Sequence, residues 1–595
     1  MIRFIGWRWN AEHRESTVQV KRQIMRLQSA HLWECVLVQP GLQVFMSCGP
    51  HDEGALRLPG GRGVVIGSIF CGGKRCRALD EAAAQRVFAH DTDELFTRYW
   101  GNYVAVLSGP GGEVTLVRAP AATLPCLRRT LGRVEQFSSC SELSWRVAPA
   151  AVRINWRRVG QQLIGPASHP QTGLHGVREL LPGWRERLTA HGVLTEAQWF
   201  PPGNGHAAPF TTVPEAASAL HSVITECTQA WAAGTSRVMV GLSGGLDSSI
   251  VLAALTAAPR VAEPVCVTHF APGLESDERH YARLAARRAR VRHLVRERAT
   301  TIDLHRAQGG MRTAHMPGLR MPEIDRDEPA LARELGATAI FRGHGGDELF
   351  MRNGALPAAC DAWCTRARGA KRLALLLHAA VSEGVTVWQV MRSIARTRFT
   401  ARHRNLLHEF LDEQADQCLL DRDFLTEILA AESLPVSHPG AARLPFGRWW
   451  QWSLATGPRP YAGPHAHPDD VPEINSLLSQ PVIEAALRIP AWLQVQDKTE
   501  RAVARAAFAQ QLPVEILARR SKGNADGPAR QVLRDHESFV RDLLLGGVLA
   551  RERVIDVERI EATLAGSPAA APAGTVALFE LTGAEIWARK WLSAG

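Results

Sequence analysis

A run of small and hydroxylated residues interrupts an apolar stretch in the middle of the chain: Ser243-Gly244-Gly245-Leu246-Asp247-Ser248-Ser249. The preceding residues 238–242 are typical of a buried strand, and residues 248–255 are typical of a helix. Two adjacent glycines permit a tight turn whose N–H groups converge, and the start of a helix adds unpaired donors. The three serine hydroxyls add more donors, so the run predicts an anion site suited to phosphates.

A carboxylate inside such an anion site requires its own explanation. Asp247 is compatible with bound phosphates chiefly if Mg²⁺ bridges its carboxylate to phosphate oxygens. The spaced glycines and the lysine of a Walker loop are absent, so this is a different kind of nucleotide loop.

A second glycine-rich run follows a short apolar stretch at 339–341: Gly343-His344-Gly345-Gly346-Asp347-Glu348-Leu349-Phe350. Three glycines at the end of a strand allow the backbone to approach a nucleotide closely. Asp347 is then placed to complete a Mg²⁺ site together with Asp247.

The elements around these runs must bring them together. Residues 265–268 are typical of another strand and residues 278–290 of another helix. Alternation of strands and helices predicts an α/β fold with a doubly wound parallel sheet, whose ligands bind beyond the carboxyl ends of the strands. The stretch 435–472 is rich in Pro, Gly, His and Trp, and we interpret it as an irregular connection, the alternative being a loop over a pocket.

The first two hundred residues have a different pattern, with short apolar runs at 36–38, 64–66 and 103–107 separated by Gly and Pro turns. Residues 201–205, Pro-Pro-Gly-Asn-Gly, are the best linker candidate. A chain of 595 residues exceeds what one core usually organises. We therefore expect a β-rich domain over 1–205 and an α/β domain over 206–595.

Composition narrows the class of protein. Hydrophobic residues make up 46% and charged residues 22%, which is typical of globular proteins. The net charge of +10 is modest for this length and does not demand nucleic acid, so we expect no nucleic-acid partner. Eleven cysteines at irregular spacing predict no disulfide framework. No run reaches the roughly 18 apolar residues of a membrane span, and the N-terminus has no signal-peptide pattern, so we expect a cytoplasmic protein.

The run from Ser243 to Ser249 resembles the pyrophosphatase-type loop (PP-loop) of the asparagine synthetase family, whose members activate a carboxylate as an acyl-adenylate and release pyrophosphate. The run from 343 to 350 resembles that family's second loop, and residues 512–523 are similar to its C-terminal segment. The resemblance implies ATP and Mg²⁺ as cofactors. It implies metal binding by Asp247 and Asp347, and a catalytic Lys522 that stabilises developing negative charge. The nucleotide ligands that it implies are Ser243, Gly244, Gly245, Asp247, Ser248, Ser249 and Gly343.

The front domain resembles the family's amidotransferase-like (Ntn) β-sandwich at residues 100–106 and 177–183. Glutamine-hydrolysing relatives expose a cysteine directly after the initiator Met, whereas this chain has Ile2, and its first cysteine is Cys35. Isoleucine has no nucleophilic atom, so we expect a degenerate domain that does not hydrolyse glutamine. Nitrogen must then come from free ammonia or from an amine on the substrate.

Three branches fit a degenerate front domain: β-lactam synthetases, lasso peptide cyclases and ammonia-dependent asparagine synthetases. The residues that resemble the lasso cyclase branch are those at 100–105, 277–283 and 480–490, together with the Gly-Gly-Asp form of the second loop. We favour this branch. It implies macrolactam formation on a precursor peptide, with a leader peptidase and a leader-recognition protein as partners.

Two alternatives stay open. His344 stands where β-lactam synthetases have a tyrosine and asparagine synthetases a glutamate, and it can act as a general base or as a hydrogen-bonding wall beside the ribose. A non-catalytic scaffold with a decayed nucleotide site is a different class of function. The presence of Ser243, Asp247, Asp347 and Lys522 together argues against it.

Overall fold

The computed structural model describes the chain except for a set of short segments. These are residues 1, 30–32, 48–53, 90–91, 166–168, 202–207, 260, 271–276, 298–311, 317–321, 365–368, 400–417, 431–437, 439, 442–443, 458–470, 497–498, 521–525, 566–572 and 594–595. Residues 202–205 of the expected linker at 201–205 lie outside the described residues. Lys522 also lies outside them. The boundary between 205 and 206 therefore stays a prediction.

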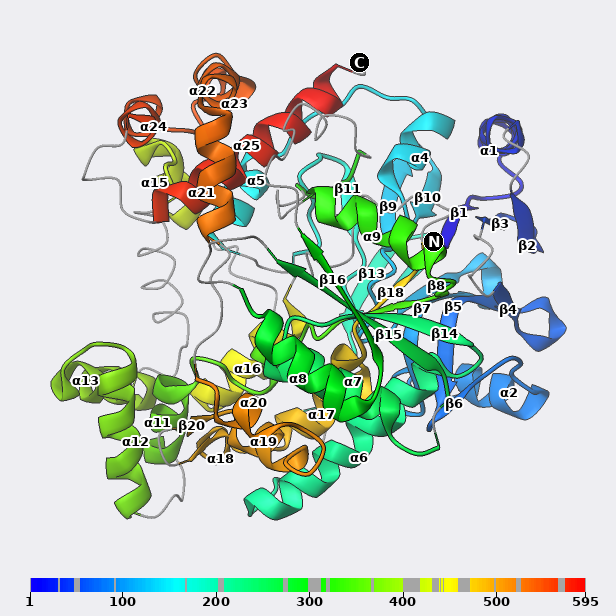
Figure 1. Ribbon diagram of the computed structural model, residues 1–595. Coiled ribbons are helices and arrows are strands. Elements are labelled where there is room, and N and C mark those ends of the chain that lie inside the picture. The colour runs from blue at the N-terminus through cyan, green and yellow to red at the C-terminus, as the bar shows by residue number, and fades with distance from the viewer. Residues whose placement is uncertain are drawn as a thin grey trace.

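The front half is a sandwich of two antiparallel sheets, as its short apolar runs predict (Figure 1). One sheet has the order β11-β9-β10-β1-β3-β2, and the other β13-β12-β8-β7-β5-β4 with β6 paired to β5. The strands are β1 (Arg3–Arg8), β2 (Glu34–Gln39), β3 (Leu42–Ser47), β4 (Ala55–Arg57), β5 (Gly63–Cys71), β6 (Lys74–Arg75), β7 (Tyr99–Ser108), β8 (Val114–Arg118), β9 (Leu127–Leu131), β10 (Val134–Ser138), β11 (Val177–Glu179), β12 (Trp184–Thr189) and β13 (Gly192–Ala197). The helices are α1 (Arg14–Gln28), α2 (Glu81–Ala89), α3 (Glu94–Thr97), α4 (Ser141–Val147) and α5 (Trp156–Ile164).

Strand β7 is mostly apolar because both of its faces are buried along most of its length. Side chains alternate between the two faces of a strand. Val104 and Val106 pack against the other sheet of the sandwich, whereas Tyr103 and Ala105 pack in a core shared with the second half of the chain.

The second half contains the expected parallel sheet, in the order β16-β15-β14-β17-β18. Its strands are β14 (Arg237–Gly241), β15 (Glu263–Phe270), β16 (Arg292–Glu297), β17 (Ile340–Phe341) and β18 (Glu473–Ile474). Helices α7 (Leu246–Thr256) and α8 (Arg279–Ala289) pack on the face of Val238 and Val240, and α9 (Pro322–Glu334) packs on the face of Met239. The sheet is thus covered on both faces, and the strand order reverses between β14 and β17, the point where such sheets bind ligands.

Helices account for most of the remaining second half. They are α6 (Val213–Ala232), α10 (Gly346–Leu349), α11 (Ala355–Cys364), α12 (Gly369–Ser382), α13 (Val387–Phe399), α15 (Arg422–Ala430), α16 (Phe446–Thr456), α17 (Gln480–Leu487), α18 (Ala491–Gln494), α19 (Ala502–Ala507), α20 (Val514–Ala518), α21 (Asp526–Asp535), α22 (Glu537–Leu545), α23 (Val548–Arg551), α24 (Val557–Leu564) and α25 (Ala573–Leu592). A short hairpin of β19 (Val495–Gln496) and β20 (Thr499–Glu500) precedes α19. Within the described part of the chain no single helix is long and apolar enough to cross a membrane; only the bent pair Lys371–Ser382 and Val387–Thr397 passes that test together, by length and composition.

Aromatic residues join the two halves. Trp100 of β7 stacks on Phe70 of β5 with ring centroids 4.3 Å apart, and Trp231 at the end of α6 meets Phe70 edge-on at 4.7 Å. The C-terminal helix α25 returns to the front half, where Trp587 and Trp591 join a core with residues near α5. Figure 1 shows α25 running beside α5.

One interpretation of the sequence is wrong. Residues 446–456, within the stretch expected to be an irregular connection, form helix α16, and Trp449 and Trp452 are buried in the shared core. The tryptophans follow an i, i+3 spacing, which places them on one helix face. The Pro and Gly residues around the helix concealed this short pattern.

Helix α16 connects the core to the second glycine-rich run. Its Gln451 is buried and donates to the Leu349 carbonyl at the end of α10, at 2.6 Å. The N-terminus of α16 is held in turn by Asp361 of α11, which accepts the Gly447 N–H at 2.6 Å. The position of α10 therefore depends on a buried carboxyl group in α11.

We predict that Asp361 makes stability depend on pH. Burial raises the pKa of this carboxyl to about 7, although the hydrogen bonds that it accepts from backbone N–H groups act to lower the pKa. The folded state therefore binds a proton that the unfolded chain releases, and the free energy of unfolding should fall as the pH rises from about 4 to 7. Between about pH 5 and about pH 8, the free energy of unfolding measured in urea should fall more for the wild type than for Asp361→Asn. Parallel pH profiles for the two proteins would contradict this assignment.

Candidate functional site

The run from Ser243 to Ser249 forms the turn between β14 and α7. Gly244 has a φ of +77°, and a Cβ there would lie 2.7 Å from the Ala282 amide nitrogen, so glycine is required. Ser243 Oγ accepts the Gly245 N–H at 3.3 Å and lies 3.0 Å from Ser248 Oγ. This closed turn lies at the N-terminus of α7, the positive end of the helix dipole.

The serines of this loop differ in their surroundings. Ser243 is exposed, whereas Ser248 and Ser249 are buried. Ser249 Oγ donates to the Gly245 carbonyl at 2.7 Å, and Ser248 Oγ accepts the Ser243 N–H at 3.2 Å. These hydroxyls support the shape of the loop in the described conformation. Their assignment as phosphate ligands stays a prediction.

The second run lies directly against the first. A Cβ on Gly343 would lie 2.4 Å from the Ser248 amide nitrogen, and a Cβ on Gly346 would lie 2.3 Å from Asp247 Cγ. No side chain fits at either position, because the two loops are in van der Waals contact. The strand ends place the loops side by side, and the missing Cβ atoms allow them to touch.

The two aspartates converge on one arginine that the sequence did not reveal. Arg501 Nη1 donates to Asp247 Oδ1 at 3.1 Å and Oδ2 at 3.0 Å, and to Asp347 Oδ1 at 3.0 Å. Arg352 lies farther away, with Nη1 at 3.4 Å from Asp347 Oδ2. Arg501 is 154 residues from Asp347 in the chain and belongs to no recognisable pattern, so only the fold brings them together.

The aspartates fit a Mg²⁺ site. Both carboxylates already contact a single positively charged nitrogen, as they would contact a shared cation. No group of three or more His, Cys, Asp or Glu side chains that could hold a metal occurs among the described residues. Two carboxylates, with the remaining positions left to phosphate oxygens and water, are the usual protein contribution to a Mg²⁺–nucleotide site.

His344 lies in the turn between Gly343 and Gly345 and is partly exposed. The next residue, Gly345, has a φ of +97° and packs against Leu478. The imidazole is therefore carried by the same tight turn as Asp347. Its role as a general base stays a prediction.

The C-terminal segment reaches the first loop through Arg519. Its guanidinium donates to the Gly244 carbonyl at 3.4 Å and to Glu278 Oε1 at 2.5 Å, and lies 4.2 Å from the centre of the Tyr281 ring. Arg505 of α19 donates to the Arg519 carbonyl at 2.8 Å. Glu278 and Tyr281 belong to the run 277–283 noted in the sequence, whereas Arg519 lies within the run 512–523 but was not assigned a role there.

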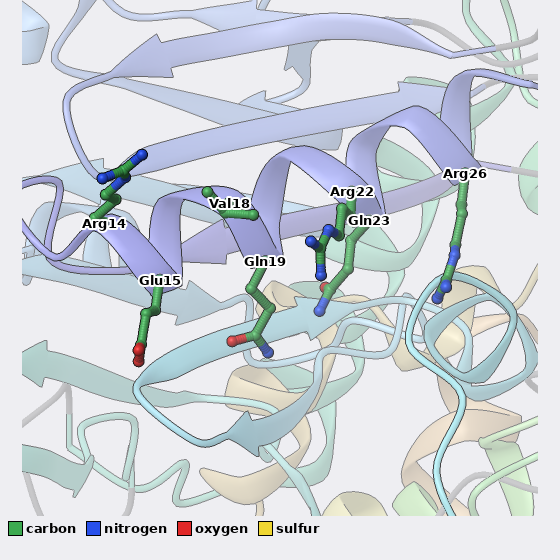
Figure 2. A pocket seen from close by; sticks show the side chains of 7 residues that line it. All are labelled: Arg14, Glu15, Val18, Gln19, Arg22, Gln23 and Arg26. Carbon is green, nitrogen blue, oxygen red and sulfur yellow. The ribbon is translucent and has the colours of Figure 1, made fainter.

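An open hollow on the front half is a different feature. It runs along α1 (Figure 2) and is lined by Arg14, Glu15, Val18, Gln19, Arg22, Gln23 and Arg26. None of these residues belongs to either loop, so the hollow is separate from the candidate site.

Comparison with known proteins identifies the second half. Residues 219–456 and 476–589, more than half of the chain, match the family described as asparagine synthase. The glutamine phosphoribosylpyrophosphate (PRPP) amidotransferase from B. subtilis, complexed with ADP and GMP, is 10% identical over 57% of this chain and 80% of its own, with a TM-score of 0.21. A structure titled as the allosteric regulatory enzyme of purine biosynthesis is also 10% identical, over 57% of this chain and 89% of its own, with a TM-score of 0.20. These two likenesses are too weak to support an assignment, and no curated protein shows significant similarity.

We predict that Gly346→Ala separates the two loops. The added methyl group would overlap the Asp247 carboxylate, so that side chain must move and nucleotide binding should weaken by about tenfold or more. Isothermal titration with Mg·ATP measures the loss. Gly109→Ala is the matched control, since its Cβ would meet only ordinary contacts at 3.5 Å or more. Equal affinities for wild type and Gly346→Ala would show that the loop contact does not shape the nucleotide site.

Proposed function

Because the chain belongs to the asparagine synthase family, a family of ATP-dependent amidating ligases, we propose that it is a lasso peptide macrolactam synthetase. It would use ATP to activate an Asp or Glu side-chain carboxylate of a precursor peptide. The N-terminal amine of the same peptide would then close an isopeptide ring. The observation that carries the ATP-dependent part is the contact of the two glycine loops, with Asp247 and Asp347 converging at the reversal point of the parallel sheet.

The loop between β14 and α7 supplies the groups for pyrophosphate. Backbone N–H groups at Gly244 and Gly245, the Ser243 hydroxyl and the start of α7 would hold its oxygens. Mg²⁺, held by Asp247 and Asp347, would neutralise charge on the departing pyrophosphate. Lys522 lies outside the described residues. It follows Arg519 by three residues, so an extended chain spans about 10 Å at most between them, which is consistent with a role at the same loop.

The source of nitrogen follows from the front half. The Ile2 side chain packs against the core of the sandwich, where glutamine-hydrolysing relatives carry a nucleophilic cysteine. Burial also raises the pKa of the first cysteine in the chain, Cys35. Ile2 has no nucleophilic atom, and we propose that the amine arrives with the substrate or as free ammonia.

The reaction divides into two balanced steps. A substrate carboxylate oxygen attacks the α-phosphorus of ATP, the bond to the β-phosphate breaks, and pyrophosphate leaves. The amine nitrogen then attacks the activated carbonyl, a C–N bond forms, AMP leaves with the bridging oxygen, and His344 is our candidate to accept the amine proton. The chain contributes mainly by holding one amine beside one activated carboxylate and by excluding water. A leader peptidase and a leader-recognition protein would supply the peptide with a free N-terminus.

We predict that the protein removes one water from a linear core peptide in the presence of Mg·ATP, with one AMP released per ring. Mass spectrometry of the peptide and nucleotide analysis measure both products. Lys522→Ala should lower the rate by about a hundredfold or more, because the transition-state charge loses its counterion. If instead aspartate is amidated by ammonia, the protein is an asparagine synthetase. If the protein turns over no ATP with any of these substrates, it is better described as a non-catalytic scaffold than as an enzyme.

We also predict that Glu278 acts through Arg519 as a positioning residue. Glu278→Gln should lower kcat by about tenfold with little change in the KM for the peptide, because the segment before Lys522 loses its ion pair to the loop. Asp277→Asn is the matched control, since the adjacent carboxylate pairs with Arg279 instead. An equal effect of the two substitutions, or a change confined to KM, would contradict this role.

A further inference from the structure

Arg501 presents a single nitrogen to both aspartates of the candidate metal site. The distances from Nη1 to the three carboxylate oxygens are 3.0 to 3.1 Å. The Arg501 side chain is 12% exposed and that of Asp247 is 11% exposed, so water screens this pair only partly. The guanidinium thus stands between the two carboxylates, in the space that a shared metal ion would need.

The backbone around Arg501 holds it in this place. Arg501 has a φ of +58°, a left-handed conformation that is uncommon for arginine. The preceding Glu500 accepts the Asn353 N–H with its carboxylate at 2.9 Å, and its carbonyl accepts Arg505 Nε at 3.1 Å. Asn353 follows α10, the helix that carries Asp347. The fold therefore fixes the start of α19 to the second loop.

We infer that Arg501 is the resident cation of this site and competes with the divalent metal for Asp247 and Asp347. The inference rests on the proposed function, which assigns the metal to these two carboxylates. Mg²⁺ needs carboxylate oxygens at about 2.0–2.1 Å, and a guanidinium nitrogen between the same oxygens excludes that geometry. The side chain of Arg501 must withdraw before both carboxylates can bind the metal.

This competition couples the metal to the nucleotide. A guanidinium that leaves these two carboxylates loses three charge-assisted contacts with their oxygens, and phosphate oxygens are the partners that best replace them. Free metal alone offers no such replacement. Metal should therefore bind weakly to the nucleotide-free protein and readily when it enters with a triphosphate.

The test is metal binding without nucleotide, measured on the full-length protein from the EPR signal of free Mn²⁺. Arg501→Gln should bind Mn²⁺ about tenfold more tightly than the wild type, because the competing charge is removed. Its melting temperature without metal should fall, since the two carboxylates lose the guanidinium that lies between them, and Mn²⁺ should raise it more than in the wild type. Asp247→Asn added to Arg501→Gln should abolish the gain in affinity.

Arg541→Gln is the matched control. It removes an equal charge from α22, where Arg541 pairs with Glu537 and Glu561 and contacts neither aspartate, so its Mn²⁺ affinity should change less than about threefold. Equal Mn²⁺ affinities of Arg501→Gln and wild type overturn the inference, as does a gain that survives Asp247→Asn. If Arg501→Gln does not fold without metal, the inference requires that Mn²⁺ restores its cooperative unfolding; a chain that stays unfolded in Mn²⁺ overturns it. None of these measurements uses the peptide. A failure of the proposed peptide reaction can therefore be told apart from a failure of this inference about the metal.

Discussion

The contact between the two glycine loops is the constraint on which the rest of the site depends. Gly343 and Gly346 approach Ser248 and Asp247 so closely that no Cβ fits between them. This approach is possible because β14 and β17 are adjacent parallel strands, whose carboxyl ends meet at the reversal point of the sheet. One packing contact therefore places the glycine turn beside both carboxylates.

Arginines from the C-terminal part of the chain complete that arrangement. Arg501 lies between the aspartates, and Arg519 joins the first loop to the N-terminus of α8 through Glu278. Arg501 reduces the repulsion between the two aspartates, and Arg519 supplies a hydrogen-bond donor to the Gly244 carbonyl. The same charges would respond if phosphates and metal bind there, as the proposed function requires.

The front half is a two-sheet sandwich that packs closely against the second half of the chain. Its strand β7 is buried on both faces, and Phe70 and Trp100 pack against Trp231 of the second half. Glu179 at the end of β11 lies 2.6 Å from His315, which belongs to a segment between β16 and α9. Removal of the sandwich would expose a large apolar surface of the second half, so the two halves depend on each other for stability.

The sequence by itself determined the parts whose signals are local. Glycine pairs after apolar runs identified both loops, Asp247 and Asp347, and strand–helix alternation identified the covered parallel sheet, because these patterns depend on neighbouring residues. It did not reveal the short strands β16 and β18, and it misread α16, whose few turns are surrounded by Pro and Gly. Only the tertiary structure placed Arg501 and Arg519 at the loops, since a single arginine more than 150 residues from its partner leaves no pattern in the sequence. The packing of the folded chain decides which carboxylate such an arginine meets, because charges and missing side chains act only over short distances.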